Sequence, residues 1–139
     1  MKNEILEIDI PPGVNTGQEL LIDGVGHEYK QGVYSRVICR VQILPHEKFE
    51  RRGNDLYYRH EISLKEALLG GEFELDLLGD KKKKVKLMAP VRTNTTTILG
   101  GMGMPVLGRR GAVGDVIVTF SVDMPVLNDH QKKVLEGIL

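Results

Sequence analysis

Polar and aliphatic residues alternate along much of this chain, and prolines and glycines interrupt the alternation at short intervals. Residues 4–10 alternate acidic with aliphatic side chains, and residues 72–77 do so again. A period of two places the aliphatic side chains on one face of an extended strand. Further strands are predicted over residues 19–22, 33–44, 56–62, 84–88 and 115–124. Residues 24–32 and 51–55 read as a loop and a polar connector, so the chain is predicted to be mostly β.

Two short helices are predicted among these strands. Ser63 and Glu66 have the spacing of a capping box, in which each side chain satisfies a backbone N–H of the other residue. Gly70-Gly71 would end that helix. Asn128 is a typical N-cap residue and predicts a second helix, which runs to Leu139.

The sequence contains an internal repeat. Residues 11–17 correspond to residues 90–96, Gly24 to Gly101, and Pro45 to Pro125. Three matches in the same order indicate duplication. The second copy begins with a strand, a helix and a strand that the first copy lacks. We therefore expect an incomplete first domain in a piece of a longer protein; a naturally short form is the alternative.

Composition and motifs argue against several classes of function. Nineteen basic residues balance nineteen acidic ones, so no global basic field attracts nucleic acid. Apolar runs are too short to span a membrane. The single cysteine, Cys39, and the four histidines have no zinc-site spacing. No paired acid–base residues and no nucleophile motif are evident. We expect no enzyme activity, no metal and no cofactor.

Two clusters of cations leave alternatives open. Lysines 81–84 form the densest charge run, and Arg109-Arg110 lie in a glycine-rich segment. Each cluster is either a solvated hairpin tip that keeps a strand edge from pairing, or a patch for an acidic peptide tail or an acidic client segment.

Four blocks of sequence together resemble the C-terminal substrate-binding region of DnaJ-type co-chaperones. They are Pro-Pro-Gly-Val-Asn-Thr-Gly-Gln from Pro11, Phe-Glu-Arg-Arg-Gly-Asn-Asp-Leu-Tyr from Phe49, Ile-Ser-Leu-Lys-Glu-Ala-Leu-Leu-Gly-Gly from Ile62, and Gly-Asp-Val-Ile-Val from Gly114. The resemblance covers nearly the whole chain. It implies two tandem β-sandwich-like domains with short helices, followed by a C-terminal helix. Residues 1–53 would be the latter part of the first domain, residues 54–126 a complete second domain, and residues 127–139 a dimerisation helix. The family's His-Pro-Asp tripeptide and its cysteine-rich zinc module have no counterpart here.

The resemblance also implies a mechanism. Unfolded client proteins would bind as extended strands in a hydrophobic depression of the first domain, for delivery to a DnaK-type (seventy-kilodalton heat-shock) chaperone. Phe49 would line that depression and be partly exposed unless something covers it; a buried position at the domain junction is the alternative. Ile5, Ile8 and Ile10 would support the same sheet and are the further candidates for client binding; a place in the core is the other interpretation. Arg51 and Arg52 are candidates for contact with an acidic tail.

The terminal helix has an apolar stripe that predicts a homodimer. Leu127 precedes it, and Val134, Leu135, Ile138 and Leu139 share one face. Packing of the stripe onto its own domain is the alternative. The expected partners are thus client polypeptides, the DnaK-type chaperone and a second copy, in the cytoplasm or an organelle matrix. The alternative function is a purely structural dimerisation and spacer module that binds no client.

Overall fold

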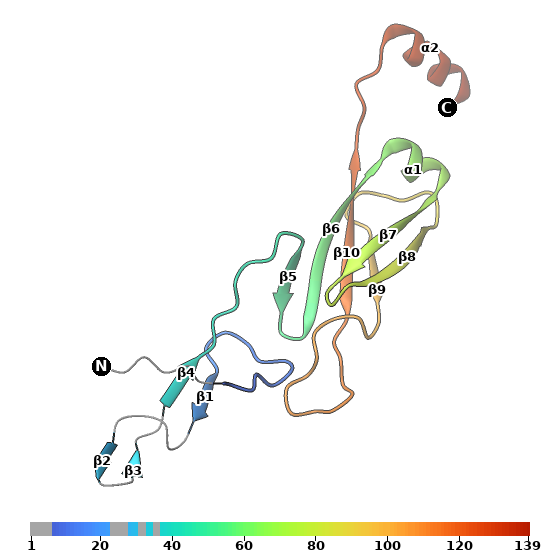
Figure 1. Ribbon diagram of the computed structural model, residues 1–139. Helices are drawn as coiled ribbons and strands as arrows, with labels where there is room; N and C mark the ends of the chain where they lie inside the picture. The colour runs from blue at the N-terminus through green and yellow to red at the C-terminus, as the bar shows by residue number, and fades with distance from the viewer. Residues whose placement is uncertain (1–6, 23–27, 31–32, 35–36) are drawn as a thin grey trace. The chain divides into compact units, whose positions relative to one another are not determined.

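The computed structural model describes residues 7–22, 28–30, 33–34 and 37–139 (Figure 1). Strands dominate these residues, so the predicted mostly-β fold is confirmed. In chain order the elements are β1 (Glu19–Ile22), β2 (Glu28–Lys30), β3 (Val33–Tyr34), β4 (Val37–Arg40), β5 (Phe49–Arg52), β6 (Asp55–Ser63), α1 (Leu64–Leu69), β7 (Gly71–Leu77), β8 (Lys81–Leu87), β9 (Thr96–Leu99), β10 (Val116–Asp123) and α2 (Asp129–Ile138).

The described strands form one four-stranded sheet and three hairpin-like pairs. The larger sheet has the order β5-β6-β10-β9, and the pairs are β1-β4, β2-β3 and β7-β8. The polar connector predicted at residues 51–55 is confirmed at Gly53 and Asn54 and wrong at its ends, because β5 runs to Arg52 and β6 begins at Asp55. Gly53 allows the turn between these strands with a φ of +62°. Strand β9 was not predicted, since a threonine-rich stretch of four residues carries little alternation.

The strand predicted over residues 33–44 is shorter in the structure. Strand β4 ends at Arg40, opposite Glu19, where its partner β1 begins. Val41 extends the contact with two backbone hydrogen bonds: its N–H donates to the Gln18 carbonyl at 2.8 Å, and its carbonyl accepts from the Gly17 N–H at 2.9 Å. The loop predicted at 24–32 is also partly wrong, because β2 lies within it and pairs with β3.

The strand predicted over residues 4–10 is not formed where the structure describes it. Residues 7–10 are irregular, and Ile8 and Ile10 are exposed, so their assignment to the core is wrong. Ile5 lies outside the described residues. Alternation reports which side chains could share a face, but a strand also needs a neighbour to bond, and no described strand pairs with residues 7–10.

The chain divides into two compact units. The first comprises residues 1–57 and 99–116, and the second comprises residues 58–98 and 117–139. Side chains buried in the first unit are Phe49, Leu56, Leu99 and Val116. Those buried in the second are Ile62, Ala67, Leu75, Val85, Leu87, Val118 and Phe120. The boundaries predicted at residues 53 and 126 stay predictions.

Both helices begin as predicted. The Ser63 hydroxyl accepts a hydrogen bond of 3.1 Å from the Glu66 N–H, and the Glu66 carboxylate accepts one of 3.3 Å from the Ser63 N–H. Gly70, with a φ of +85°, ends α1. Asn128 and Gln131 form the same reciprocal pair at the start of α2.

Within the described part of the chain, no helix combines the length and the apolar character needed to cross a membrane. The same residues contain no group of three histidine, cysteine, aspartate or glutamate side chains arranged to hold a metal ion.

Candidate functional site

The β1-β4 pair exposes aliphatic side chains on one of its faces. Leu21 lies opposite Ile38 in the register, and these two side chains are 52% and 58% exposed. Glu19 and Arg40 share that face and form an ion pair of 3.3 Å. The opposite face carries the half-buried Leu20, Ile22, Val37 and Cys39. One face of this small sheet is therefore apolar, and the other carries an exposed aliphatic pair beside an ion pair.

The surroundings of this sheet leave it accessible. None of the side chains described over residues 7–22 and 37–48 is buried. In the described part of the chain β1 pairs only with β4, so each strand has one edge without a ladder partner. A free edge offers backbone N–H and C=O groups to an incoming extended chain. Exposed aliphatic side chains beside such an edge can hold the side chains of that chain.

Phe49 is placed differently from its predicted position. It begins β5 and is only 6% exposed, so the expected partial exposure is wrong. The His46 ring lies 5.4 Å from the Phe49 ring, centroid to centroid. The His46 Nδ1 accepts backbone hydrogen bonds of 3.0 Å from Lys48 and 3.3 Å from Phe49. This folded-back segment brings the imidazole over the phenyl ring. Its contact with a client stays a prediction.

Arg51 and Arg52 already have partners within the chain. The Arg51 guanidinium donates hydrogen bonds of 2.9 Å and 2.6 Å to the carbonyls of Gly13 and Val14. Arg52 lies 3.3 Å from Glu50 and stacks 4.5 Å above the Tyr57 ring. Arg51 thus fixes the Pro-Pro-Gly turn, and a contact of either arginine with an acidic tail stays a prediction.

The lysine run belongs to a charge-paired hairpin. Strand β8 begins at Lys81, three residues before the predicted start, and its even-numbered lysines face the acidic residues of β7. Lys82, Lys84 and Lys86 lie opposite Asp76, Glu74 and Glu72 in the register. The Lys82 Nζ also lies 3.4 Å from the Glu74 carboxylate. This pattern favours a solvated strand over a patch for acidic peptides.

An aromatic cluster in the second unit contains the one titratable group with a shifted pKa among the residues described. The His60 ring stacks on Phe73 at a centroid distance of 3.9 Å, and both rings meet Phe120 edge-on. Desolvation lowers the pKa of His60 below 6.5, while the negative charge of Glu66 opposes that change. Tyr58 Oη lies 3.1 Å from His60 Nδ1. The arrangement holds a neutral imidazole within apolar surroundings.

The residues predicted for dimerisation remain uncovered in the single chain. Val134, Ile138 and Leu139 are exposed, and Leu127 and Leu135 are half-buried. No residue of the ten-residue helix α2 is buried. Their role in dimerisation stays a prediction.

The residues missed by the sequence analysis are Leu21 and Ile38. A signal was present, because Leu20-Leu21-Ile22 and Val37-Ile38-Cys39 are continuous apolar runs without alternation. Such runs predict strands that are apolar on both faces. They do not tell whether another part of the same chain covers both faces.

Comparison with known proteins identifies a family that matches most of this chain. The family model described as the DnaJ C terminal domain matches residues 1–125. The chaperone protein DnaJ of Halobacterium salinarum is 40% identical over 133 residues, which cover 94% of this chain and 34% of that protein. Chaperone protein DnaJ 2 of Aquifex aeolicus is 35% identical over 135 residues, 96% of this chain and 36% of that protein. The chain spans about a third of the length of these curated relatives.

Proposed function

Because the chain belongs to the DnaJ C-terminal domain family, we propose that it binds extended hydrophobic segments of unfolded client proteins. The client would then pass to a DnaK-type chaperone, and the chain would act as a homodimer. The relatives are named as DnaJ chaperones, which supports a co-chaperone role.

The observation that carries client binding is the exposed Leu21–Ile38 pair on a sheet with free edges. A client segment would add as a strand, so that its main chain supplies hydrogen bonds common to every polypeptide. Leu21 and Ile38 would select aliphatic or aromatic client side chains. Burying one such side chain contributes about 1.5–3 kcal/mol. This combination of weak side-chain selectivity with generic backbone pairing suits a binder of many unfolded sequences.

A peptide titration tests the proposal. A fluorescein-labelled extended peptide rich in leucine and isoleucine is titrated with the whole chain, and anisotropy reports binding. Ile38→Asp places a charge on the apolar face and is expected to weaken binding about tenfold or more. Ile98→Asp is the matched control, because Ile98 is an isoleucine 65% exposed in another short strand, β9.

The outcomes separate client binding from the spacer alternative. If Ile38→Asp loses peptide binding and Ile98→Asp retains it, the client binds at the β1-β4 sheet. An equal loss in both variants contradicts that site. A chain that dimerises but binds no peptide at any concentration tested contradicts client binding and favours the structural dimerisation and spacer module.

Phe49→Ala does not provide a comparably clean test of the site. Truncation of a buried phenylalanine costs about 3–5 kcal/mol of folding free energy. Its effect on peptide binding would therefore mix lost contacts with lost structure.

A further inference from the structure

Residues 105–113, termed here the arginine loop, form a closed turn within the first unit. Val106 N–H donates to the Ala112 carbonyl at 2.9 Å, and Ala112 N–H donates to the Arg109 carbonyl at 3.2 Å. Gly108 and Gly111 adopt φ values of +76° and +82°, which a side chain would disfavour. These bonds fix the backbone that carries Arg109 and Arg110.

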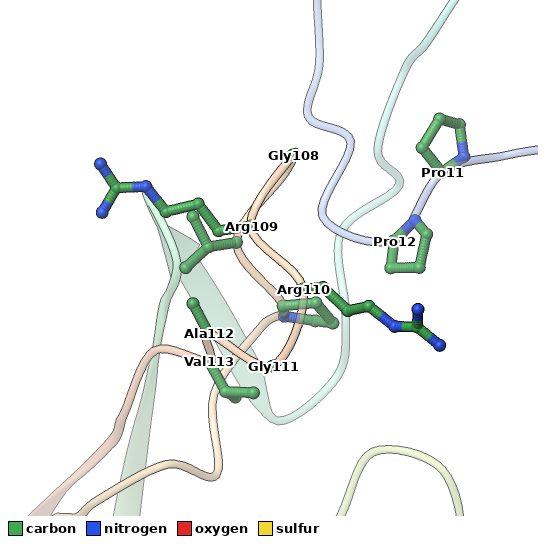
Figure 2. Close-up of a pocket in the computed structure, with 10 residues that line it drawn as sticks. Pro11, Pro12, Gly108, Arg109, Arg110, Gly111, Ala112 and Val113 are labelled. Atoms are coloured by element: carbon green, nitrogen blue, oxygen red, sulfur yellow. The ribbon is translucent and has the colours of Figure 1, made fainter.

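The arginine loop and the Pro-Pro turn enclose an open cleft of about 370 Å³ (Figure 2). This volume lies in the range typical of small-ligand sites. The rings of Pro11 and Pro12 form one wall, and the loop forms the other. Among the described residues that line the cleft, the only charged side chains are those of Arg109 and Arg110, and the others are apolar residues or glycine.

Close backbone contacts fix the position of one wall relative to the other. A Cβ added to Gly13 would lie 2.7 Å from the Leu107 nitrogen and would also meet the Pro105 carbonyl oxygen. Only glycine allows so close an approach at this φ of +92°. Arg51 binds the Gly13 and Val14 carbonyls from the other side. The cleft is thus organised before any ligand arrives, which reduces the entropic cost of binding.

The two arginines present unmatched positive charge. Both side chains are exposed, and in the described part of the chain neither forms an ion pair or a side-chain hydrogen bond. Figure 2 shows their guanidinium groups pointing to opposite sides of the loop, with that of Arg110 on the side of Pro12. Diverging guanidinium groups fit two separate carboxylates better than one phosphate.

We propose that this cleft binds a peptide segment in which acidic residues flank an aliphatic side chain. The aliphatic side chain would enter between the prolines and the loop, and each carboxylate would meet one arginine. The three prolines in the lining have no N–H to donate, so contact with an extended main chain would be weaker here than at a strand edge. This site is separate from the β1-β4 sheet and does not depend on the function proposed for that sheet.

The probe is a fluorescein-labelled synthetic peptide, Gly-Ser-Glu-Leu-Glu-Ser-Gly, titrated against the whole chain at low ionic strength. The double variant R109Q/R110Q is expected to weaken binding about tenfold, since it removes both ion pairs with the peptide carboxylates. The double variant K132Q/K133Q removes the same charge from exposed neighbouring residues of α2 and is expected to bind as the unmodified chain does.

Altered peptides and a competition with phosphate test the chemistry of the ligand. Peptides with glutamine in place of both glutamates, or glycine in place of leucine, are expected to bind at least fivefold more weakly. Equal binding of either peptide overturns the proposal, as does equal weakening by the two double variants. Displacement of the probe by millimolar inorganic phosphate would assign the arginines to a phosphate ligand and also overturn it. Ile38→Asp is expected to leave this binding unchanged, so failure here and failure of client binding are distinguishable.

Discussion

Two glycines of the first unit sit where backbone segments touch. A Cβ added at Gly114 would meet the Asn54 carbonyl oxygen and lie 2.9 Å from Asp55 Oδ1. A Cβ added at Gly103 would lie 2.7 Å from the Asn54 oxygen. This close packing lets Met104 N–H reach the Asn54 carbonyl at 2.8 Å and Asp115 N–H reach Asp55 Oδ1 at 2.8 Å. The Gly-Asn-Asp block at residues 53–55 and the Gly-Asp block at residues 114–115 therefore pack directly against each other.

Gly114→Ala is expected to reduce the free energy of unfolding by about 1–3 kcal/mol, because the methyl group forces the backbone of Asn54 and Asp55 away. Urea denaturation measures the change. Gly137→Ala is the control, because its Cβ would meet open space within helix α2, where alanine is favoured. Equal stability of Gly114→Ala and the unmodified chain would contradict the close approach.

His60 predicts a pH dependence of stability. Its pKa is below 6.5 in the folded chain because of desolvation, whereas an unfolded histidine has a pKa near 6.5. Below about pH 6.5 the unfolded chain therefore binds more protons, and this contribution to stability is lost as the pH falls through the folded pKa. Above pH 6.5 it is fully present.

The variant that tests this effect is His60→Phe, which keeps an aromatic ring beside Phe73 but cannot titrate. Urea midpoints at pH 7.5 and pH 5.5 are expected to differ less in His60→Phe than in the unmodified chain. His130→Gln is the control, because His130 is exposed on α2. The expectation fails if His60→Phe keeps the full pH dependence. It also fails if His130→Gln reduces that dependence equally.

At the scale of elements, helix α1 depends on its cap. The helix has six residues and buries only Ala67, so few other contacts define where it starts. Ser63→Ala removes the hydroxyl that accepts from Glu66 N–H and is expected to cost about 1 kcal/mol. Ser63→Asp keeps an acceptor at that position and is expected to cost much less. Thermal denaturation of both variants tests the cap, and equal melting temperatures would argue against it.

The elements also show which structure the sequence could predict. Local signals were sufficient for α1 and α2, since a cap and its reciprocal partner lie three residues apart. Strands β9 and β5 escaped prediction because their strand character comes from neighbours in the sheet rather than from their own composition. The opposite error occurred at residues 7–10, where strong alternation predicted a strand that does not form, since no described strand pairs with them.

The candidate sites likewise combine features set by the local sequence with features set by distant parts of the chain. Four sequence blocks were enough to identify the family, because their residues are fixed by local geometry such as the Gly53 turn and the Ser63 cap. The contact between the Phe49 and His46 rings could not be read from the sequence, since it depends on how the chain folds back after Pro45. The arginine-loop cleft likewise could not be predicted, because its two walls are distant in the sequence. Pro11 in one wall and Pro105 in the other are 94 residues apart.

At the scale of the whole molecule, helix α2 is the element that most needs a partner. A ten-residue helix is marginal in water without tertiary packing, and no side chain of α2 is buried in the single chain. Ile138 is 72% exposed, and Val134 lies one turn before it on the same face. A two-fold pair would place this stripe against its own copy and bury it in both chains.

The expected state of the chain in solution is therefore a dimer with twice the 15.5 kDa mass of one chain. Sedimentation equilibrium measures this mass. The double variant V134D/I138D is expected to sediment as a monomer, because two charges would be buried without partners in the paired stripe. The double variant K132Q/K133Q changes adjacent exposed positions of the same helix and is expected to remain a dimer. A dimer that persists in V134D/I138D would place the interface elsewhere. A monomeric unmodified chain would leave α2 to pack against its own unit, and in that case V134D/I138D should lower the thermal midpoint without changing the mass.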